Sequence, residues 1–109
     1  MPPVPQFAAL ADETRCGIVE LLRDRPRPVH ELAAAFAISR PAVSRHLRLL
    51  REAGLVAEER HGRENVYSLE RQQLRLIGAW LEQHWATKLS SLKRLAETTA
   101  ATSKGETDQ

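Results

Sequence analysis

The chain has 109 residues, of which 42% are hydrophobic and 28% charged, and its formal net charge is +2. This composition predicts one soluble domain with a single modest core. No apolar run approaches the roughly 20 residues that span a bilayer, and the opening MPPVPQ lacks the layout of a signal peptide. We therefore expect a cytoplasmic protein without a membrane partner. Cys16, the only cysteine, excludes an intrachain disulfide, and zinc would need other ligands or another subunit.

The positive charge is concentrated in the middle of the chain. Residues 1–39 carry four arginines against five acidic residues, which sums to −1. Residues 40–63 carry six arginines against three acidic residues, or +3, and residues 64–109 carry six of each sign, or zero. This asymmetry indicates a surface that faces nucleic acid.

The N-terminal part is predicted to be a disordered segment over residues 1–6 and then two helices. The first helix is expected at about residues 7–11 and the second at about residues 13–23, with Asp12 as the N-cap of the second. Cys16 lies beside apolar neighbours on the second helix. A small buried hydrophobe is its expected role, and redox sensing is the alternative.

Residues 29–36 are predicted to form a short amphipathic helix, and a three-residue link leads from it to a helix with well-marked ends. Ser39 suits the N-cap of that helix, Pro41 its first turn and Gly54 the position after its end. Its inward face has Ala42, Val43, Leu47, Leu50 and, less centrally, Leu49, and its outward face has Arg40, Ser44, Arg45, Arg48 and Arg51. With no acidic residue between Arg40 and Arg51, the outward face suits a polyanion. The two helices predict a helix-turn-helix, whose second helix enters the major groove.

The periodicity after Gly54 changes to that of a β-hairpin. LVAEER and VYSL predict two strands, and HGREN predicts the turn between them. Gly62 is the first candidate for a positive φ and Asn65 the second. A hairpin at this place is a wing, and Arg60, His61 and Arg63 would lie near its tip, within reach of phosphates or a minor groove.

A helical period returns over residues 71–96, with more apolar surface than the small core can cover. We expect this last helix to pair with its copy in a homodimer, with Phe7 and Leu10 alongside. Trp80 and Trp85 are expected in or near that dimer core, and a small-ligand cavity between the paired last helices is the alternative. The ordered domain then spans residues 7–96, and residues 97–109 are predicted to be a disordered tail. The predicted interface residues are Phe7, Leu10, Ile77, Trp80, Leu81, Trp85, Leu89 and Leu92.

These segments together resemble a known family. The order ALADETR, VHELA, SRPAVSRHLRLLREAGLV and ERHGRENVYSL is similar to the ArsR (SmtB-like) winged helix-turn-helix repressors over about residues 7–96. The closing WLEQHW resembles the branch that lacks metal-binding cysteines. The resemblance implies a mainly α fold with a small β-hairpin wing, and a homodimer held by its first and last helices. It also implies a pseudo-palindromic operator with half-sites about 34 Å apart.

The metal sites of the family are incomplete in this sequence. Pro28 and His30 stand where thiolate sensors have a Cys-x-Cys motif. Glu82 and His84 resemble half of the other common site, but its second half falls on Leu95 and Thr98. Half a site cannot complete a tetrahedral shell, so we predict neither a metal nor another cofactor.

The recognition helix and the wing supply the predicted DNA contacts. Arg40, Ser44 and Arg45 are predicted at base edges, because the N-terminal half of a recognition helix penetrates the groove. Ser39, His46 and Arg48 are predicted at phosphates, and Arg63 at the minor groove or the backbone. The full set of predicted DNA-binding residues is Ser39, Arg40, Ala42, Ser44, Arg45, His46, Arg48, Arg60 and Arg63.

The leading hypothesis is a sequence-specific transcriptional repressor that binds double-stranded operator DNA as a homodimer. One alternative is a protein-interaction module on a winged-helix scaffold. Another is the same repressor with a redox or small-ligand response to an unknown effector. An enzyme is not expected, because the sequence has no paired carboxylates, activated nucleophile, phosphate-cradling glycine loop or complete metal set.

Overall fold

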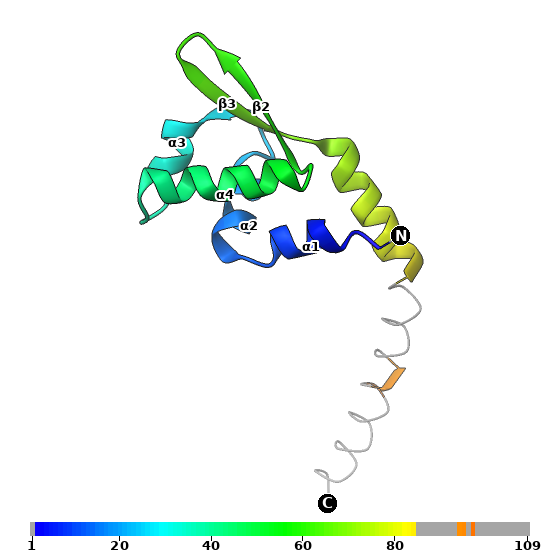
Figure 1. Ribbon diagram of the computed structural model, residues 1–109. Coiled ribbons are helices and arrows are strands. Elements are labelled where there is room, and N and C mark those ends of the chain that lie inside the picture. The colour runs from blue at the N-terminus through cyan, green and yellow to red at the C-terminus, as the bar shows by residue number, and fades with distance from the viewer. Residues whose placement is uncertain (1, 85–93, 96, 98–109) are drawn as a thin grey trace, which may run out of the picture. The chain divides into compact units, whose positions relative to one another are not determined.

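The computed structural model describes residues 2–84, 94, 95 and 97, and the chain divides into two compact units, residues 1–77 and residues 78–109. In the first unit α4 lies between the β2–β3 hairpin on one side and helices α1 and α2 on the other (Figure 1). Residues 71–84 are also helical. The other elements in chain order are α1 (Val4–Leu10), α2 (Glu13–Leu21), β1 (Arg27–Pro28), α3 (Val29–Ala34), α4 (Arg40–Glu52), β2 (Val56–His61) and β3 (Glu64–Leu69).

Helix α1 begins at Val4, three residues before its predicted start. Residues 4–6, which the sequence predicted to be disordered, are therefore helical. A proline in the first helical turn sacrifices no hydrogen bond, so Pro5 is compatible with this start. The amide of Gln6 also donates to the carbonyl oxygen of Ala53 at 3.3 Å, which holds this turn against the end of α4.

Helix α2 begins as predicted. The carboxylate of Asp12 accepts a hydrogen bond from the backbone N–H of Arg15 at 3.0 Å, the geometry of an N-cap. The helix ends at Leu21, two residues earlier than predicted. The expected burial of Cys16 is wrong: its side chain is exposed, because the buried face of α2 is centred on Ile18, and its Sγ donates to the carbonyl oxygen of Leu10 at 2.8 Å.

Both ends of α4 agree with the sequence. The hydroxyl of Ser39 accepts from the backbone N–H of Ala42 at 3.2 Å. At the other end Gly54 has a φ of +76°, its N–H donates to the carbonyl of Arg51, and the N–H of Leu55 donates to that of Leu50. This pair of bonds is the Schellman motif, which needs a residue that adopts a left-handed conformation.

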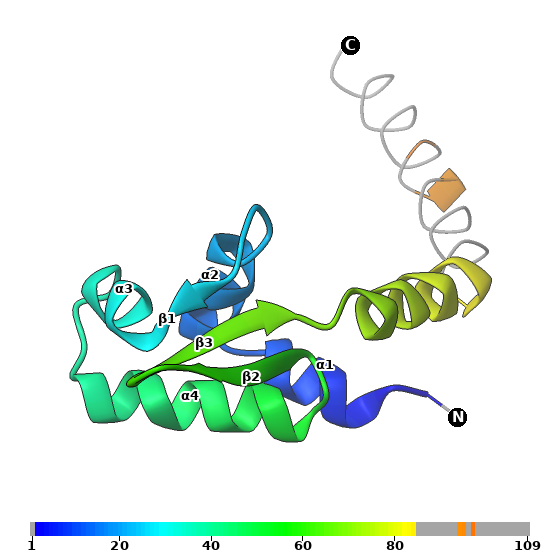
Figure 2. The ribbon, with the colours of Figure 1, turned by 90° about the horizontal axis from the view of Figure 1, so that it is seen from above.

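The strands form a three-stranded antiparallel sheet in the described part of the chain, in the order β1-β3-β2 (Figure 2). The hairpin is longer than predicted, since His61 pairs with Glu64 and only Gly62 and Arg63 form the loop. Gly62 has a φ of +65°, and a glycine at the first of two central positions is typical of a type II′ turn. Asn65 lies within β3. Strand β1 was not predicted, because it has only two residues and Pro28 is tolerated there only at a sheet edge.

The core lies where α2, α3, α4 and the base of the hairpin meet. Its fully buried side chains are Ile18, Leu22, Leu32, Val43, Leu47, Leu50 and Leu55. Leu49, which the sequence placed on the edge of the inward face, is 38% exposed. None of the helices within the described residues is both long enough and apolar enough to cross a membrane.

Gly17 allows α2 to approach Phe36 closely. A Cβ at Gly17 would lie 2.8 Å from Cε1 of Phe36, whereas a Cβ at the helical Gly78 meets nothing within 4 Å. We expect Gly17→Ala to lower the free energy of unfolding by about 1 kcal/mol, because overpacking outweighs the better helix propensity of alanine. Gly78→Ala should instead raise it by up to about 1 kcal/mol. Urea unfolding of both variants checks this, and a stabilised Gly17→Ala would mean that Phe36 moves aside freely.

Candidate DNA-binding surface

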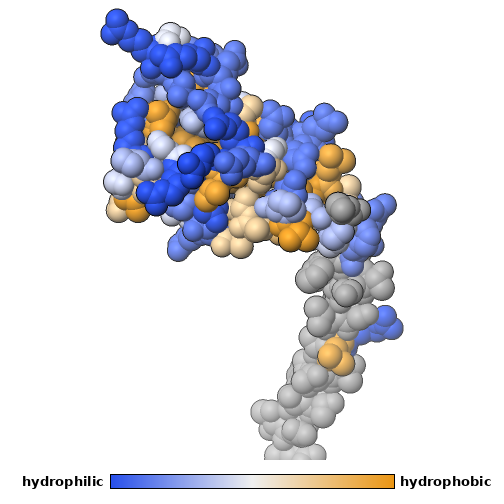
Figure 3. Space-filling view, viewed as in Figure 1, coloured by the Kyte–Doolittle hydropathy of each residue, from blue (hydrophilic) through white to orange (hydrophobic). Residues whose placement is uncertain are grey.

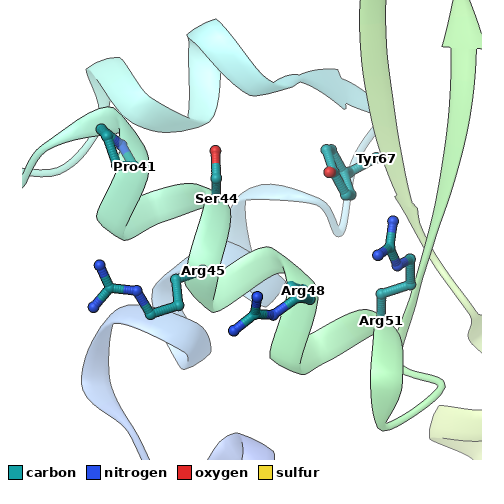
Figure 4. A pocket seen from close by; sticks show the side chains of 6 residues that line it. All are labelled: Pro41, Ser44, Arg45, Arg48, Arg51 and Tyr67. Carbon is teal, nitrogen blue, oxygen red and sulfur yellow. The ribbon is translucent and has the colours of Figure 1, made fainter.

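The outward face of α4 forms one wall of an open groove of about 420 Å³. Arg45 and Arg48 point away from the hairpin, while Arg51 extends toward it (Figure 4). Arg40, Ser44, Arg45 and Arg48 are exposed, as the helical period predicted. The residues that line the groove are Pro41, Ser44, Arg45, Arg48, Arg51 and Tyr67.

The arginines of this face differ in their ion pairing from those of the segment between α2 and α3. Arg23, Arg25 and Arg27 each lie within 3.2 Å of a carboxylate, on Glu20, Glu31 and Asp24 respectively. Arg40, Arg45 and Arg63 have no ion-pair partner among the residues that the structure describes. Arg48 lies 3.8 Å from Glu52, and both side chains are exposed, so that pair neutralises little charge. Unpaired arginines therefore lie on α4 and at the turn of the hairpin, and Arg75 on the helix over residues 71–84 is another among the described residues.

Arg51 is bound within the protein. Its guanidinium forms an ion pair with Glu58 of β2, and Glu58 is the cross-strand neighbour of Tyr67 on β3. Burial, and then the negative charge of Glu58, raise the pKa of the Tyr67 hydroxyl above its usual value. These three side chains connect the C-terminal half of α4 to the hairpin, a contact between distant residues that no local sequence pattern indicates.

The tip of the hairpin presents hydrophilic side chains (Figure 3). Arg63 is exposed, and the Nε of Arg60 donates to the carbonyl oxygen of Gly62 at 3.1 Å. Near the tip, the imidazole of His30 on α3 lies 2.9 Å from the carboxylate of Glu64. The hairpin is thus connected to α3 as well as to α4. These two contacts hold in place the strands that present Arg60 and Arg63.

Three predicted contact residues have other partners or less exposure than the arginines. The Nδ1 of His46 lies 3.0 Å from Nη1 of Arg15, and the His46 side chain is only 22% exposed. The hydroxyl of Ser39 is engaged in capping α4, and Ala42 is half-buried. His46 is therefore on the side of α4 that packs against α2, and its contact with DNA stays a prediction that this geometry does not favour.

The residues predicted for a dimer interface differ in how far the single chain already buries them. Phe7 and Leu10 pack partly against the core of the first unit, and Ile77, 6% exposed, belongs to that core, so its place in an interface stays a prediction that this burial does not favour. In the second unit Trp80 is half-buried and stacks on His84 with centroids 4.6 Å apart, and Leu81 is 36% exposed. Trp85, Leu89 and Leu92 lie outside the described residues.

Within residues 2–84, two large apolar side chains outside the predicted interface set are more than half exposed. Val4 on α1 is 60% exposed and Leu76 on the helix over residues 71–84 is 57% exposed. Leu76 could have been noticed in the sequence, because it directly precedes Ile77 and a helix cannot bury both equally. Such side chains are candidates for contact with another chain.

No group of three or more histidine, cysteine, aspartate or glutamate side chains that could hold a metal is found in the described part of the chain. His30 and His61 each pair with a glutamate, and His84 has its Nδ1 3.0 Å from the carbonyl oxygen of Trp80. The predicted half-site at Glu82 and His84 is exposed.

Helices α3 and α4 form a helix-turn-helix, and the β2–β3 hairpin that follows is a wing, so the first unit is a winged helix-turn-helix domain. Residues 12–58 match the sequence family of bacterial regulatory proteins named arsR. The chain belongs to the ArsR family and is a DNA-binding transcriptional regulator.

Two relatives match almost the whole chain. The HTH-type transcriptional regulator Rv2034 of Mycobacterium tuberculosis is 39% identical over 95 residues, which cover 87% of this chain and 89% of the relative. The arsenical resistance operon repressor of Escherichia coli is 35% identical over 103 residues, which cover 90% of this chain and 85% of the relative.

Solved structures support the same assignment. A possible transcriptional regulator for arsenical resistance matches with a TM-score of 0.73 and 39% identity, over 82% of this chain and 93% of the other. A homodimeric winged helix-turn-helix DNA-binding domain from Mycobacterium bovis, described as a possible ArsR-family regulator, matches with a TM-score of 0.63 and 28% identity. That match covers 75% of this chain and 83% of the other. The predicted fold class is confirmed.

Proposed function

We propose that this chain represses transcription by binding a pseudo-palindromic operator as a homodimer, in the cytoplasm and without catalysing a reaction. The observation that carries the proposal is the free positive charge of Arg40, Arg45 and Arg63 on the helix α4 and the wing, whereas the arginines between α2 and α3 are ion-paired. Phosphates are the counterions that such a surface selects.

The proposed complex places α4 in the major groove. The helix has 13 residues and is about 20 Å long, enough to cross the groove. Arg40, Ser44 and Arg45 then face base edges, and Arg48 faces a phosphate. Arg63, with Arg60 beside it, reaches the minor groove or the backbone from the wing.

A mobility-shift titration with the DNA upstream of the chain's own gene tests the proposal. Unrelated DNA of equal length serves as the control, and both are titrated at several salt concentrations. We expect the upstream DNA to bind at least a thousandfold more tightly. Equal affinity for both would overturn specific regulation, and failure to bind any duplex at low salt would favour a protein-interaction module.

The homodimer is supported by the homodimeric domain from Mycobacterium bovis and by exposed apolar side chains at Val4, Leu76 and Leu81. Two copies related by a two-fold axis would present two α4 helices to successive major grooves, about 34 Å apart. Half-sites should therefore be about one helical turn apart, which a footprint of the bound operator measures.

Leu76→Glu is expected to convert the dimer to a monomer, because it would bury a charge in the proposed interface. The side chain is exposed in the single chain, so the variant should still fold. Arg75→Glu, an exposed position about 100° around the same helix from Leu76, is the control and should stay dimeric. Light scattering reads the result, and a dimeric Leu76→Glu would move the interface away from this face.

A further inference from the structure

The side chain of Arg15 joins three elements of the first unit. Its Nε donates to the carbonyl oxygen of Ala9 in α1 at 2.6 Å, and its Nη1 lies 3.0 Å from Nδ1 of His46 in α4. Nη1 is also 3.9 Å from the carboxylate of Asp12, the N-cap of its own helix α2. Only 15% of the side chain is exposed. We propose that Arg15 is a positioning residue that holds the recognition helix α4 against α1, so that operator binding depends on it without any contact to DNA.

Arg15, Ala9, Asp12 and His46 form what we call the Arg15 junction. Arg15 is the donor in each of its hydrogen bonds. An arginine side chain can only donate, so Nδ1 of His46 must accept. The guanidinium has donors on separate nitrogens, so Nε and Nη1 reach Ala9 and His46 at once, whereas all three donors of a lysine ammonium lie on one nitrogen. The carboxylate of Asp12 accepts from the backbone N–H of Arg15, and this hydrogen bond, together with the charge of the Arg15 guanidinium, outweighs desolvation and lowers the pKa of Asp12. Asp12 is thus held as an anion beside the guanidinium.

The location of His46 explains why the junction matters for DNA. It directly follows Arg45 in α4, and its contact with Arg15 fixes how α4 is rotated about its own axis. A second polar contact, from Gln6 to the carbonyl of Ala53, holds the C-terminal end of the helix. Between the two contacts lies an open groove of about 330 Å³, so side-chain packing alone does not set the distance between α1 and α4 there. The lining residues of this groove are Pro5, Ala8, Ala9, Arg15, Leu49, Glu52 and Ala53.

A rotation of α4 affects base contacts more than phosphate contacts. A guanidinium that donates two hydrogen bonds to guanine tolerates little error in distance or angle, whereas the attraction to phosphates is long-ranged and indifferent to sequence. Loss of the Arg15 junction should therefore lower operator affinity and leave binding to unrelated DNA unchanged.

The test compares Arg15→Lys with Arg23→Lys as a matched control, because Arg23 is 69% exposed and pairs only with Glu20 through its side chain. Both variants are titrated with the operator and with unrelated DNA. We expect Arg15→Lys to bind the operator about tenfold more weakly, with an unchanged salt slope and unchanged binding to unrelated DNA. Arg23→Lys should match the wild type in operator affinity, in salt slope and in binding to unrelated DNA.

Variants of His46 test the same contact from the α4 side. They decide the question if thermal unfolding shows that Arg15→Lys is not folded. His46→Gln retains an acceptor and should bind the operator nearly as the wild type does, whereas His46→Leu should show the tenfold loss. Combining His46→Leu with Arg15→Lys should cost no more than either change alone, since both remove one junction.

Three outcomes would overturn the positioning role: operator binding by Arg15→Lys equal to wild type, full additivity of the two substitutions, or a salt slope reduced by one in His46→Leu. The last would place His46 on a phosphate. The inference rests on the proposed function, but the two fail differently. Equal binding of wild type to operator and unrelated DNA contradicts the proposed function, whereas a wild-type preference that survives in every variant contradicts only the role of Arg15.

Discussion

Arg45→Ala is expected to weaken operator binding by about 1–3 kcal/mol and to relax the preference at one base pair. Arg45 is exposed in the N-terminal half of α4, has no ion-pair partner among the described residues, and points away from the hairpin in Figure 4. Its loss should therefore remove a base contact and leave the fold intact. Titration against a set of operators mutated one base pair at a time measures both effects.

Arg63→Ala is the matched comparison, since Arg63 is also an unpaired, exposed arginine but lies at the turn of the wing. Removing a phosphate contact should weaken binding to all sequences alike and reduce the salt slope by about one. Two variants with the same sequence preference and the same slope would contradict the division of labour between α4 and the wing.

Leu47→Ala is expected to lower the free energy of unfolding by about 2–5 kcal/mol. Leu47 is fully buried where α4 packs on the core, so its truncation leaves a cavity beneath the recognition helix. For a domain of this size such a loss is a large part of the total stability. Urea unfolding measured by circular dichroism gives the difference.

Leu49→Ala, two residues further along α4, makes the same chemical change at a side chain that is 38% exposed. Its cost should be below about 1 kcal/mol, because little apolar area returns to water. Equal costs at the two positions would mean that a partner chain covers Leu49, and a dependence of the Leu49→Ala effect on protein concentration would identify that partner as a second copy.

Features that depend on neighbouring residues were predicted well from the sequence. Asp12 and Ser39 cap their helices, and Gly54 and Gly62 have the left-handed conformations that the chain needs after α4 and in the wing. Each of these is a short-range matter of one side chain and the backbone within a few residues. The outward residues of α4 were predicted from the helical period alone, because a helix places residues three and four apart on the same side.

Predictions that depended on how elements pack were less reliable. Cys16 was expected in the core and is exposed, while Ile77 was expected at an interface and is buried in the first unit. An apolar stripe tells which side of a helix is buried but not which surface covers it. The two-residue strand β1 exists only because β3 lies beside it, so no period within residues 27–28 could have indicated it.

The sequence by itself determined the helix-turn-helix, the wing and the arginine-rich face of α4, because periodicity, capping and charge are written in consecutive residues. Only the tertiary structure decided which arginines are free. Arg51 is bound by Glu58, and Arg15 by Ala9 and His46, while Arg40, Arg45 and Arg63 remain unpaired among the described residues. The physical reason is distance along the chain. Arg15 and His46 are 31 residues apart, and only folding brings two such side chains within a hydrogen bond of each other.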